Sequence, residues 1–310
     1  YKLEIVDQLH RAIKSDFHLR ALAVSTTQLV RVACERHELS GAAAIVIGRT
    51  LTAACLLTSL TKDTRERVRI NIKGRGLLGR VLADCRSNGD IRGCLMAADR
   101  DRTRPAPERS QTGRISIAKL TGRGQVAITR DLGLEQPYQG SVELVSGEID
   151  EDIEGYLTTS EQLPSALGAE VILDGHGNVA RAGGILCQTF PGGDQTLLTN
   201  LRTSLRTGSL HDLLLQPRTP AGLLGFGLGG ADFDDMGATP LQFNCPCGPH
   251  TARKLDSELC RDYDLILVME SRQKERLSRA FPEASGKTFL LSHWNGGHDI
   301  PDPYKRGRDA

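Results

Sequence analysis

Two cysteines separated by a single residue, Cys245 and Cys247, are the densest chemical signal in the sequence. Two thiols at this spacing can bind one soft metal ion, and Pro246 stiffens the loop that presents them. Metal binding would keep both cysteines as thiolates, which oxidants attack readily. A structural zinc site needs four ligands, so two more would come from elsewhere in the chain. The alternative is a pair of surface thiols without function, and we favour the metal or redox role.

The eight cysteines are scattered over 310 residues, and no signal peptide is recognisable at the start of the chain. This usage is typical of a reducing compartment, where paired cysteines serve metal or redox chemistry and not structural disulfides. We therefore predict a cytoplasmic protein. The chain starts at Tyr1 and stops at Ala310 after a charged run, so we interpret both ends as fragment ends.

Two further stretches of the sequence match the residue spacing of phosphate-binding motifs. Residues 74–79 (GRGLLG) match the G-x-G-x-x-G spacing of dinucleotide-binding loops, but the residues that follow alternate like a strand, so we predict a hairpin turn. Cys94 and Arg100 match the C-x5-R spacing of cysteine-dependent phosphatases. The loop between them lacks the glycines that expose backbone amides to a phosphate, so we interpret this match as coincidence.

The elements around these residues predict an α+β domain over residues 1–190. Helical spacing of apolar residues predicts three helices, at 25–37, 42–60 and 147–163. Alternation and turn residues predict antiparallel strands within 67–95, a strand pair within 114–132 and a hairpin over 168–190. Ser25 or Thr26 is the predicted cap of the first helix. The second helix is apolar enough to cross a bilayer, but Arg49 lies at its middle, so we predict a core helix and no membrane partner.

Charge is segregated along the chain although the formal net charge is only +1. Residues 65–130 hold 16 Lys and Arg against 6 Asp and Glu, whereas residues 131–180 hold 11 Asp and Glu and no Lys or Arg. The basic stretch contains no aromatic residue on which single-stranded bases could stack. We therefore predict that the two segments compensate each other as opposed surfaces of one fold, with no nucleic-acid partner. The acidic helix is predicted to be a solvated face.

The character of the sequence changes after residue 190. Short leucine-rich helices and glycine-rich joints predict a helical linker over 191–240 that can rearrange. A short segment, 241–248, carries the two cysteines. Residues 249–310 then predict a helix, a buried strand at 264–269, an amphipathic helix at 271–281 and a strand at 287–291, which is a partial β-α-β unit of a parallel sheet.

Four blocks in this order, residues 25–60, 70–95, 129–166 and 241–248, closely resemble the heat-shock protein 33 family of redox-regulated holdase chaperones. The resemblance covers about residues 1–248. It implies an N-terminal α+β domain, a helical linker and a zinc-thiolate switch whose oxidation forms disulfides, releases zinc and unfolds the linker. The apolar surface exposed in this way captures unfolding client proteins. The resemblance also implies a homodimer on oxidation.

Cys245 and Cys247 match the family's C-x-C zinc ligands, whereas the family's later C-x-x-C pair is absent here. The candidates for the missing ligands are Cys260, His250, His293 and His298. The resemblance therefore implies an incomplete zinc site and a switch that cannot form both disulfides. We predict constitutive or poorly regulated binding of clients.

Residues 249–310 resemble the C-terminal half of a low-molecular-weight protein tyrosine phosphatase, through residues 250–283 and the IPDPY segment at 300–304. In that family the aspartate of the D-P-Y loop protonates the leaving phenolate, a general-acid role that falls to Asp302 here. The family's nucleophile lies in an N-terminal C-x5-R loop, which this chain lacks in the right context. We therefore predict a non-enzymatic chaperone fused to a phosphatase-like fragment, with an active phosphatase as the alternative.

Overall fold

The computed structural model divides the chain into two compact units, Tyr1–Pro249 and His250–Ala310. The described residues are 7–15, 18–60, 66–96, 108–109, 114–133, 137–193, 195–216, 219–227, 233–243, 255–262, 266–290, 292–293 and 297–299. Helices combined with mainly antiparallel sheets make the fold α+β, as predicted.

The first unit contains a five-stranded antiparallel sheet with the strand order β10-β11-β2-β1-β12. Its strands are β10 (Ser165–Leu173), β11 (Val179–Thr189), β2 (Leu19–Ser25), β1 (Gln8–Lys14) and β12 (Asp234–Pro240). The strands β10 and β11 form the predicted hairpin. The carboxylate of Asp174 fixes its turn by accepting hydrogen bonds from the backbone N–H groups of His176 and Asn178, both at 2.9 Å.

A six-stranded sheet has the strand order β13-β5-β4-β3-β8-β9. Its strands are β13 (Gln242–Phe243), β5 (Asp90–Met96), β4 (Arg80–Arg86), β3 (Arg67–Gly74), β8 (Gly124–Asp131) and β9 (Tyr138–Glu143). Neighbours are antiparallel except β13, which runs parallel to β5. Alternation along β3 buries Val68, Ile70 and Ile72 and leaves Arg69 exposed. Residues 74–79 lie at the turn from β3 to β4, so the predicted hairpin turn is confirmed.

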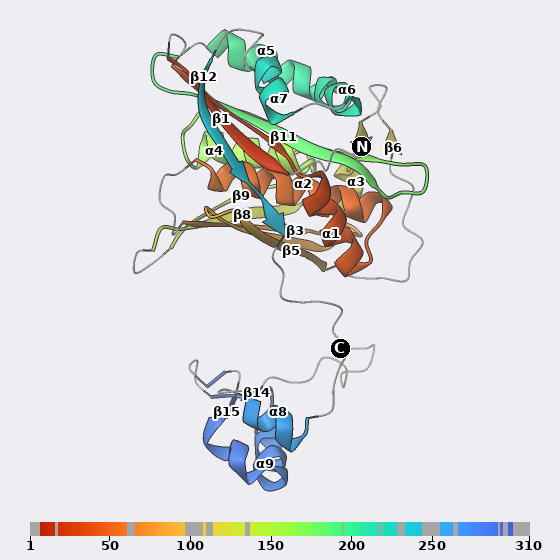
Figure 1. Ribbon diagram of the computed structural model, residues 1–310, viewed down its shortest axis with the longest axis vertical. Coiled ribbons are helices and arrows are strands. Elements are labelled where there is room, and N and C mark those ends of the chain that lie inside the picture. Colours follow the sequence, from red (N-terminus) through yellow and green to blue (C-terminus); the bar gives the residue numbers. More distant parts are fainter. Residues whose placement is uncertain are drawn as a thin grey trace. The chain divides into compact units, whose positions relative to one another are not determined.

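Helix α2 (Gly41–Thr58) lies between the two sheets (Figure 1). It is long and apolar enough to cross a membrane, but 94% of it is buried inside the protein. It packs against strands of both sheets and against α1 (Thr27–His37) and α4 (Ile149–Thr159). The buried residues around α2 form one continuous core, so the predicted core helix is confirmed.

Helix α1 is capped by a residue that the sequence prediction did not name. Thr26 occupies the cap position, but its hydroxyl shares a hydrogen bond with the hydroxyl of Thr52 in α2, at 2.7 Å. The Ser25 hydroxyl donates to Asp7. Asp7 provides the cap, because its Oδ2 accepts a hydrogen bond from the backbone N–H of Leu29 at 2.5 Å. This cap comes from outside the local sequence pattern, which is why the pattern missed it.

One further prediction is wrong, and another is wrong at one end only. Residues 114–132 do not form a strand pair, because the short helix α3 (Ala118–Thr121) separates β7 (Ile115–Ser116) from β8, and β7 pairs instead with β6 (Glu108–Arg109). The carboxylate of Glu148 accepts a hydrogen bond from the Ile117 N–H at 3.0 Å, which holds the chain where α3 starts. The predicted helical linker contains helices within residues 195–227, but its last residues form strand β12, because the edge of β1 offers unpaired backbone groups.

The described residues of the second unit contain the predicted β-α-β unit. The strands β14 (Ile266–Val268) and β15 (Thr288–Leu290) are parallel, and α9 (Ser271–Ala280) lies between them in the chain. Glu270 and Gln273 form a capping box at the start of α9. The remaining elements are α8 (Ser257–Asp262) and a 3-10 helix (Pro282–Lys287).

Candidate functional site

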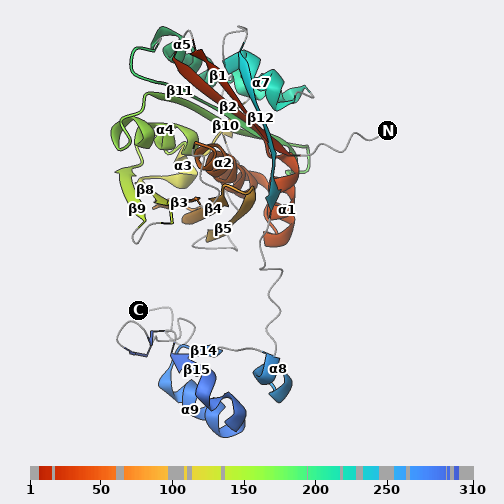
Figure 2. The same cartoon turned by 60° about the vertical axis from the view of Figure 1, so that its left-hand side comes forward.

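Three helices cover the face of the five-stranded sheet that points away from α2 (Figure 1; Figure 2 shows two of them, α5 and α7, from another side). This helical cover consists of α5 (Gln195–Arg206), α6 (Ser209–Leu215) and α7 (Pro220–Gly227). Seven of its leucines are buried against the sheet: Leu198, Leu201, Leu205, Leu210, Leu214, Leu223 and Leu224. The sheet residues that pack against these leucines include small ones such as Ala21 and Ala23. The cover and the sheet therefore enclose an apolar core that is distinct from the core around α2.

The helices of the cover depend on the sheet for their stability. They contain 12, 7 and 8 residues, and isolated helices of such lengths are marginal in water. Leu198, Leu201 and Leu205 form one apolar stripe on α5, and packing of that stripe supplies the missing stability. Helices that left the sheet would lose their structure, and an apolar sheet face would become accessible to unfolding proteins.

Two arginines of α5 also pair with α4. Arg206 Nη2 lies 3.0 Å from Glu154 Oε1, and Arg202 Nε lies 3.2 Å from the same oxygen. Arg202 Nε further donates to the Ser165 carbonyl at 2.8 Å. Burial raises the pKa of Glu154, although the Leu167 N–H and both arginines act in the opposite direction. Because the arginine side chains are about one-third exposed, we expect leucine burial to stabilise the cover more than these ion pairs do.

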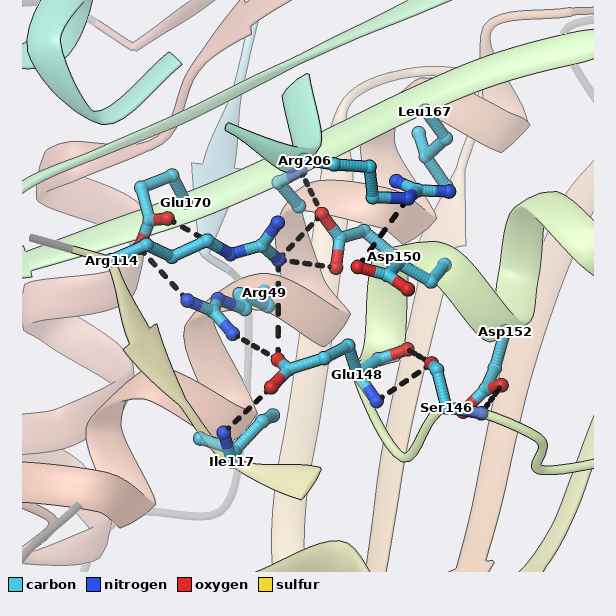
Figure 3. Close-up of polar contacts among 12 residues, drawn as sticks. Arg49, Arg114, Ile117, Ser146, Glu148, Asp150, Asp152, Leu167, Glu170 and Arg206 are labelled. Atoms are coloured by element: carbon cyan, nitrogen blue, oxygen red, sulfur yellow. Dashed lines mark hydrogen bonds and ion pairs between the residues drawn. The ribbon is translucent and has the colours of Figure 1, made fainter. Parts of the chain in front are cut away.

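A buried ionic network ties α2 to α4 and β10 (Figure 3). Arg49 is fully buried in α2 and contacts Glu148 at 2.7 Å and Glu170 at 3.0 Å. Arg114 contacts Asp150 at 2.6 Å and Glu170 at 3.4 Å. Burial alone would raise the pKa of Asp150, but the charges of Arg114 and Arg49 outweigh it and lower that pKa. Asp150 therefore stays ionised although it is excluded from water.

The acidic helix is not the solvated face that the sequence suggested. In α4, Asp150, Asp152 and Glu154 are buried. Asp152 accepts hydrogen bonds from the backbone N–H groups of three preceding residues, each at 2.9 Å: Val145, Ser146 and Gly147. These bonds hold the loop that leads into α4.

The basic and acidic segments compensate each other inside the protein, and the prediction of opposed surfaces is wrong. Arg114 pairs with Asp150, and Arg130 pairs with Glu161 at 2.8 Å. Arg130 also contacts the buried Glu66 at 3.3 Å. Sequence reasoning missed these pairs because alternation identifies buried apolar positions but does not identify which charges face inward.

The chain that leads to Cys245 borders both sheets. Strand β12 pairs with β1 at the edge of one sheet, and β13 pairs with β5 at the edge of the other. Between these strands, the Leu241 N–H donates to the Asp7 carbonyl at 3.0 Å. Arg11 adds a hydrogen bond to the Thr239 hydroxyl at 2.8 Å. A displacement of the cysteine segment would therefore pull directly on the edges of both sheets.

Asp7 makes the stability of this junction depend on pH. Burial raises the pKa of Asp7 to about 6, despite hydrogen bonds from Leu29 and Ser25 that act in the opposite direction. Because this pKa exceeds the ordinary value of 3.8, the ionised carboxylate destabilises the fold above about pH 6. Stability is regained as the pH falls through about 6 towards 3.8.

We expect Asp7→Asn to become more stable relative to the parent chain as the pH rises. The difference between their free energies of unfolding should grow by about 2 kcal/mol from about pH 4.5 to about pH 7.5, as measured by urea denaturation. Asp174→Asn is the matched control, because hydrogen bonds from Asn178 lower the pKa of the exposed Asp174 and reverse the sign. A difference for Asp7→Asn that stays constant with pH would contradict the raised pKa.

The residues predicted to carry chemistry lie mainly outside the described part of the chain. Cys245, Cys247, His250 and Asp302 belong to that group, so their roles remain predictions. None of the six cysteines that the structure does describe is in a disulfide bond: Cys34, Cys55, Cys85, Cys94, Cys187 and Cys260.

Three of the candidate zinc ligands are described. Cys260 is fully buried on α8, and burial raises the pKa of its thiol, whereas a zinc ligand must be a thiolate. The His293 ring lies 4.9 Å from the Phe289 ring between centroids, and His298 is exposed. Among the residues described, no three His, Cys, Asp or Glu side chains gather as a metal site. Because Cys245 and Cys247 lie outside the described residues, the identity of the remaining zinc ligands stays a prediction.

Sequence reasoning also missed the ionic network, although one signal pointed to it. Arg49 interrupts an otherwise apolar helix, and a charge in that position needs a partner when the helix is buried. The partners, Glu148 and Glu170, come from segments about 100 residues away and could not be named from the helix alone.

Comparison with known proteins gives two matches along the chain. A family model described as Hsp33 protein matches residues 7–259. A second model, described as low molecular weight phosphotyrosine protein phosphatase, matches residues 242–310. The two matches overlap around the cysteine segment.

Similar proteins span nearly the whole chain. The 33 kDa chaperonin of Geobacter sulfurreducens is 36% identical over 294 residues, which are 94% of this chain and 92% of that protein. The 33 kDa chaperonin of Desulforamulus reducens is 36% identical over 270 residues, 87% of this chain and 90% of its own length. The crystal structure of the 33 kDa chaperonin from Thermotoga maritima, a heat shock protein 33 homolog, is 27% identical and covers 88% of each chain with a TM-score of 0.69.

Proposed function

Because the chain belongs to the Hsp33 family of chaperones, we propose that it is a holdase that captures unfolding proteins on the apolar face of its five-stranded sheet. The apolar core beneath the helical cover carries this proposal. It is separate from the main core, so the cover can leave the sheet without dismantling the packing around α2. Clients would then bind through apolar contacts to the exposed face.

Redox control of this holdase is proposed to be weak. Cys245 and Cys247 lack the second cysteine pair that the family resemblance implies, and the thiol of Cys260 is buried. Zinc bound by two thiolates alone would dissociate readily, because a structural site requires four ligands. Dimerisation on oxidation and a cytoplasmic location belong to the same proposal.

The test measures aggregation of a chemically unfolded client with the reduced chain and with the peroxide-treated chain. We expect suppression in both states, and less than one bound zinc per chain in the reduced sample. Cys245→Ser should lower the zinc content further and leave suppression in place. No suppression in either state would refute the holdase. Suppression only after peroxide, with one zinc per chain, would refute weak control and indicate a complete switch.

The phosphatase-like segment does not support a second function. Its match is limited to residues 242–310, and the general-acid candidate Asp302 needs a nucleophile that neither that segment nor the strand position of Cys94 provides. We propose that this segment has no catalytic role in this chain.

A further inference from the structure

The outer face of the six-stranded sheet, opposite to the face that packs on α2, contains a cavity of about 450 Å³. Arg69 and Asn71 of β3, Arg80 of β4, Arg92 of β5 and Thr129 of β8 are among the residues that line it. These positions alternate with the buried residues of the same strands, so the sheet itself holds them on one surface. A cavity of this size is within the range of small-molecule sites.

The cavity has a strong excess of positive charge. Among the described residues that line it, Asp84 is the only acidic one. Asp84 is bound by both Arg67 and Arg69, and its carboxylate lies 3.6 Å from Arg92. Three arginines line the cavity with this one carboxylate, Arg69, Arg80 and Arg92, which leaves a formal net charge of +2. Since Arg67 and Arg69 already saturate Asp84, the charge of the other two arginines is not neutralised there.

The arginines that remain are held in place but have unused donors. Arg80 Nε donates to Asn71 Oδ1 at 2.8 Å, which orients the guanidinium and leaves its terminal nitrogens without a partner among the described residues. The 3.6 Å contact of Arg92 with Asp84 is longer than a hydrogen bond. The cavity is also lined by His37, whose Nε2 is buried and has no hydrogen-bond partner in the described part of the chain. These groups can all donate to an anion.

The cavity is not uniformly polar. Leu82 and Ala127 point to the same surface as the arginines and add apolar area to its lining. A ligand that fills the cavity would place an anionic group against guanidiniums and an apolar group against these two side chains. A formal net charge of +2 favours a doubly charged phosphate over a singly charged carboxylate, and guanidinium groups match phosphate oxygens in pairs.

We propose that this cavity binds a small organic phosphate, with its phosphate on Arg80 and Arg92 and its apolar part on Leu82 and Ala127. The site is independent of the helical cover, because it lies on the other sheet and on the face away from the core. It gives the chaperone a place where a phosphorylated metabolite can stabilise the six-stranded sheet.

The experiment titrates the full chain with phenyl phosphate, inorganic phosphate and benzoate by calorimetry. We expect one phenyl phosphate per chain, bound at least about tenfold more tightly than either other probe. Arg80→Gln and Arg92→Gln should each weaken phenyl phosphate binding about tenfold or more, because each removes a charged hydrogen bond. Arg123→Gln is the matched control, an exposed arginine of the same unit outside this cavity, and should leave the affinity unchanged.

Leu82→Ala tests the apolar contact of the ligand separately from its phosphate contact. It should weaken phenyl phosphate binding and leave the affinity for inorganic phosphate unchanged. Thermal melts establish that each variant folds, and the Lys variant at the same position, Arg80→Lys or Arg92→Lys, replaces a Gln variant that does not. Binding of phenyl phosphate that survives both arginine substitutions, an equal loss in Arg123→Gln, or no saturable binding would overturn the site. Benzoate that binds as tightly as phenyl phosphate would contradict the preference for a phosphate group. Inorganic phosphate that binds as tightly as phenyl phosphate would contradict the contact with an apolar group.

Discussion

Replacing Arg49 with Met is expected to lower the free energy of unfolding of the first unit by about 3–5 kcal/mol. The guanidinium is fully buried and contacts Glu148 and Glu170, and it also donates to the Ile115 carbonyl at 2.8 Å. Its removal leaves the carboxylates of the network, including Asp150, with Arg114 as their remaining cation. Urea denaturation followed by circular dichroism measures the loss.

Two further variants test whether this loss of stability arises because buried carboxylates lose their positively charged partner. Arg123→Met removes an exposed arginine and should change stability by less than about 0.5 kcal/mol. Adding Glu170→Gln to Arg49→Met removes one of the two carboxylates that lost Arg49 as a partner, and should recover part of the loss. A loss below about 1 kcal/mol in Arg49→Met, or no recovery in the double variant, would contradict the role that we assign to the network.

Truncating Leu198 and Leu205 together to Ala should make the chain hold clients without peroxide treatment. Both side chains are buried between α5 and the sheet, and each truncation removes about 2–5 kcal/mol of packing. Because α5 depends on that packing, the cover should open while the core around α2 stays folded. Suppression of client aggregation measures the function, and hydrogen exchange over residues 195–227 measures the opening.

Leu215→Ala is the matched control for this variant. Its side chain is 56% exposed at the end of α6, so its truncation should alter neither hydrogen exchange nor client binding. Faster exchange in the Leu198→Ala/Leu205→Ala variant without stronger suppression would show that the sheet face is not the client site. Unchanged exchange would show that the leucine stripe does not hold the cover.

Periodicity predicted those elements whose stability comes from local pattern and burial. The strands around Ile70 and the helix around Arg49 lie where alternation and apolar spacing place them. The pattern failed for α3 and for β12, because a hydrogen bond from the Ile117 N–H to Glu148 and the free edge of β1 decide those segments. Both partners are distant in sequence, so no window of local composition contains the information.

The candidate site, too, could be predicted from the sequence only in part. The leucine stripe of α5 was recognisable from spacing, but that it packs on the sheet with its own apolar core was not. The prediction that the acidic helix is a solvated face was wrong, because the sequence does not show whether an aspartate such as Asp150 faces water or an arginine such as Arg114. The roles of Cys245 and Cys247 rest on their spacing and on the family to which the chain belongs.

The pairing of β1 with β12 has a consequence for synthesis of the chain. Arg11 and Thr239 bond across this pair although 228 positions separate them. At 5–20 residues per second, a ribosome needs roughly 10–45 s to make the intervening residues. During that interval the edge of β1 has no partner, and the leucines of the cover have not all emerged to bury the sheet face. Until residues 234–240 have been made, this edge and the apolar sheet face are therefore accessible to other chains.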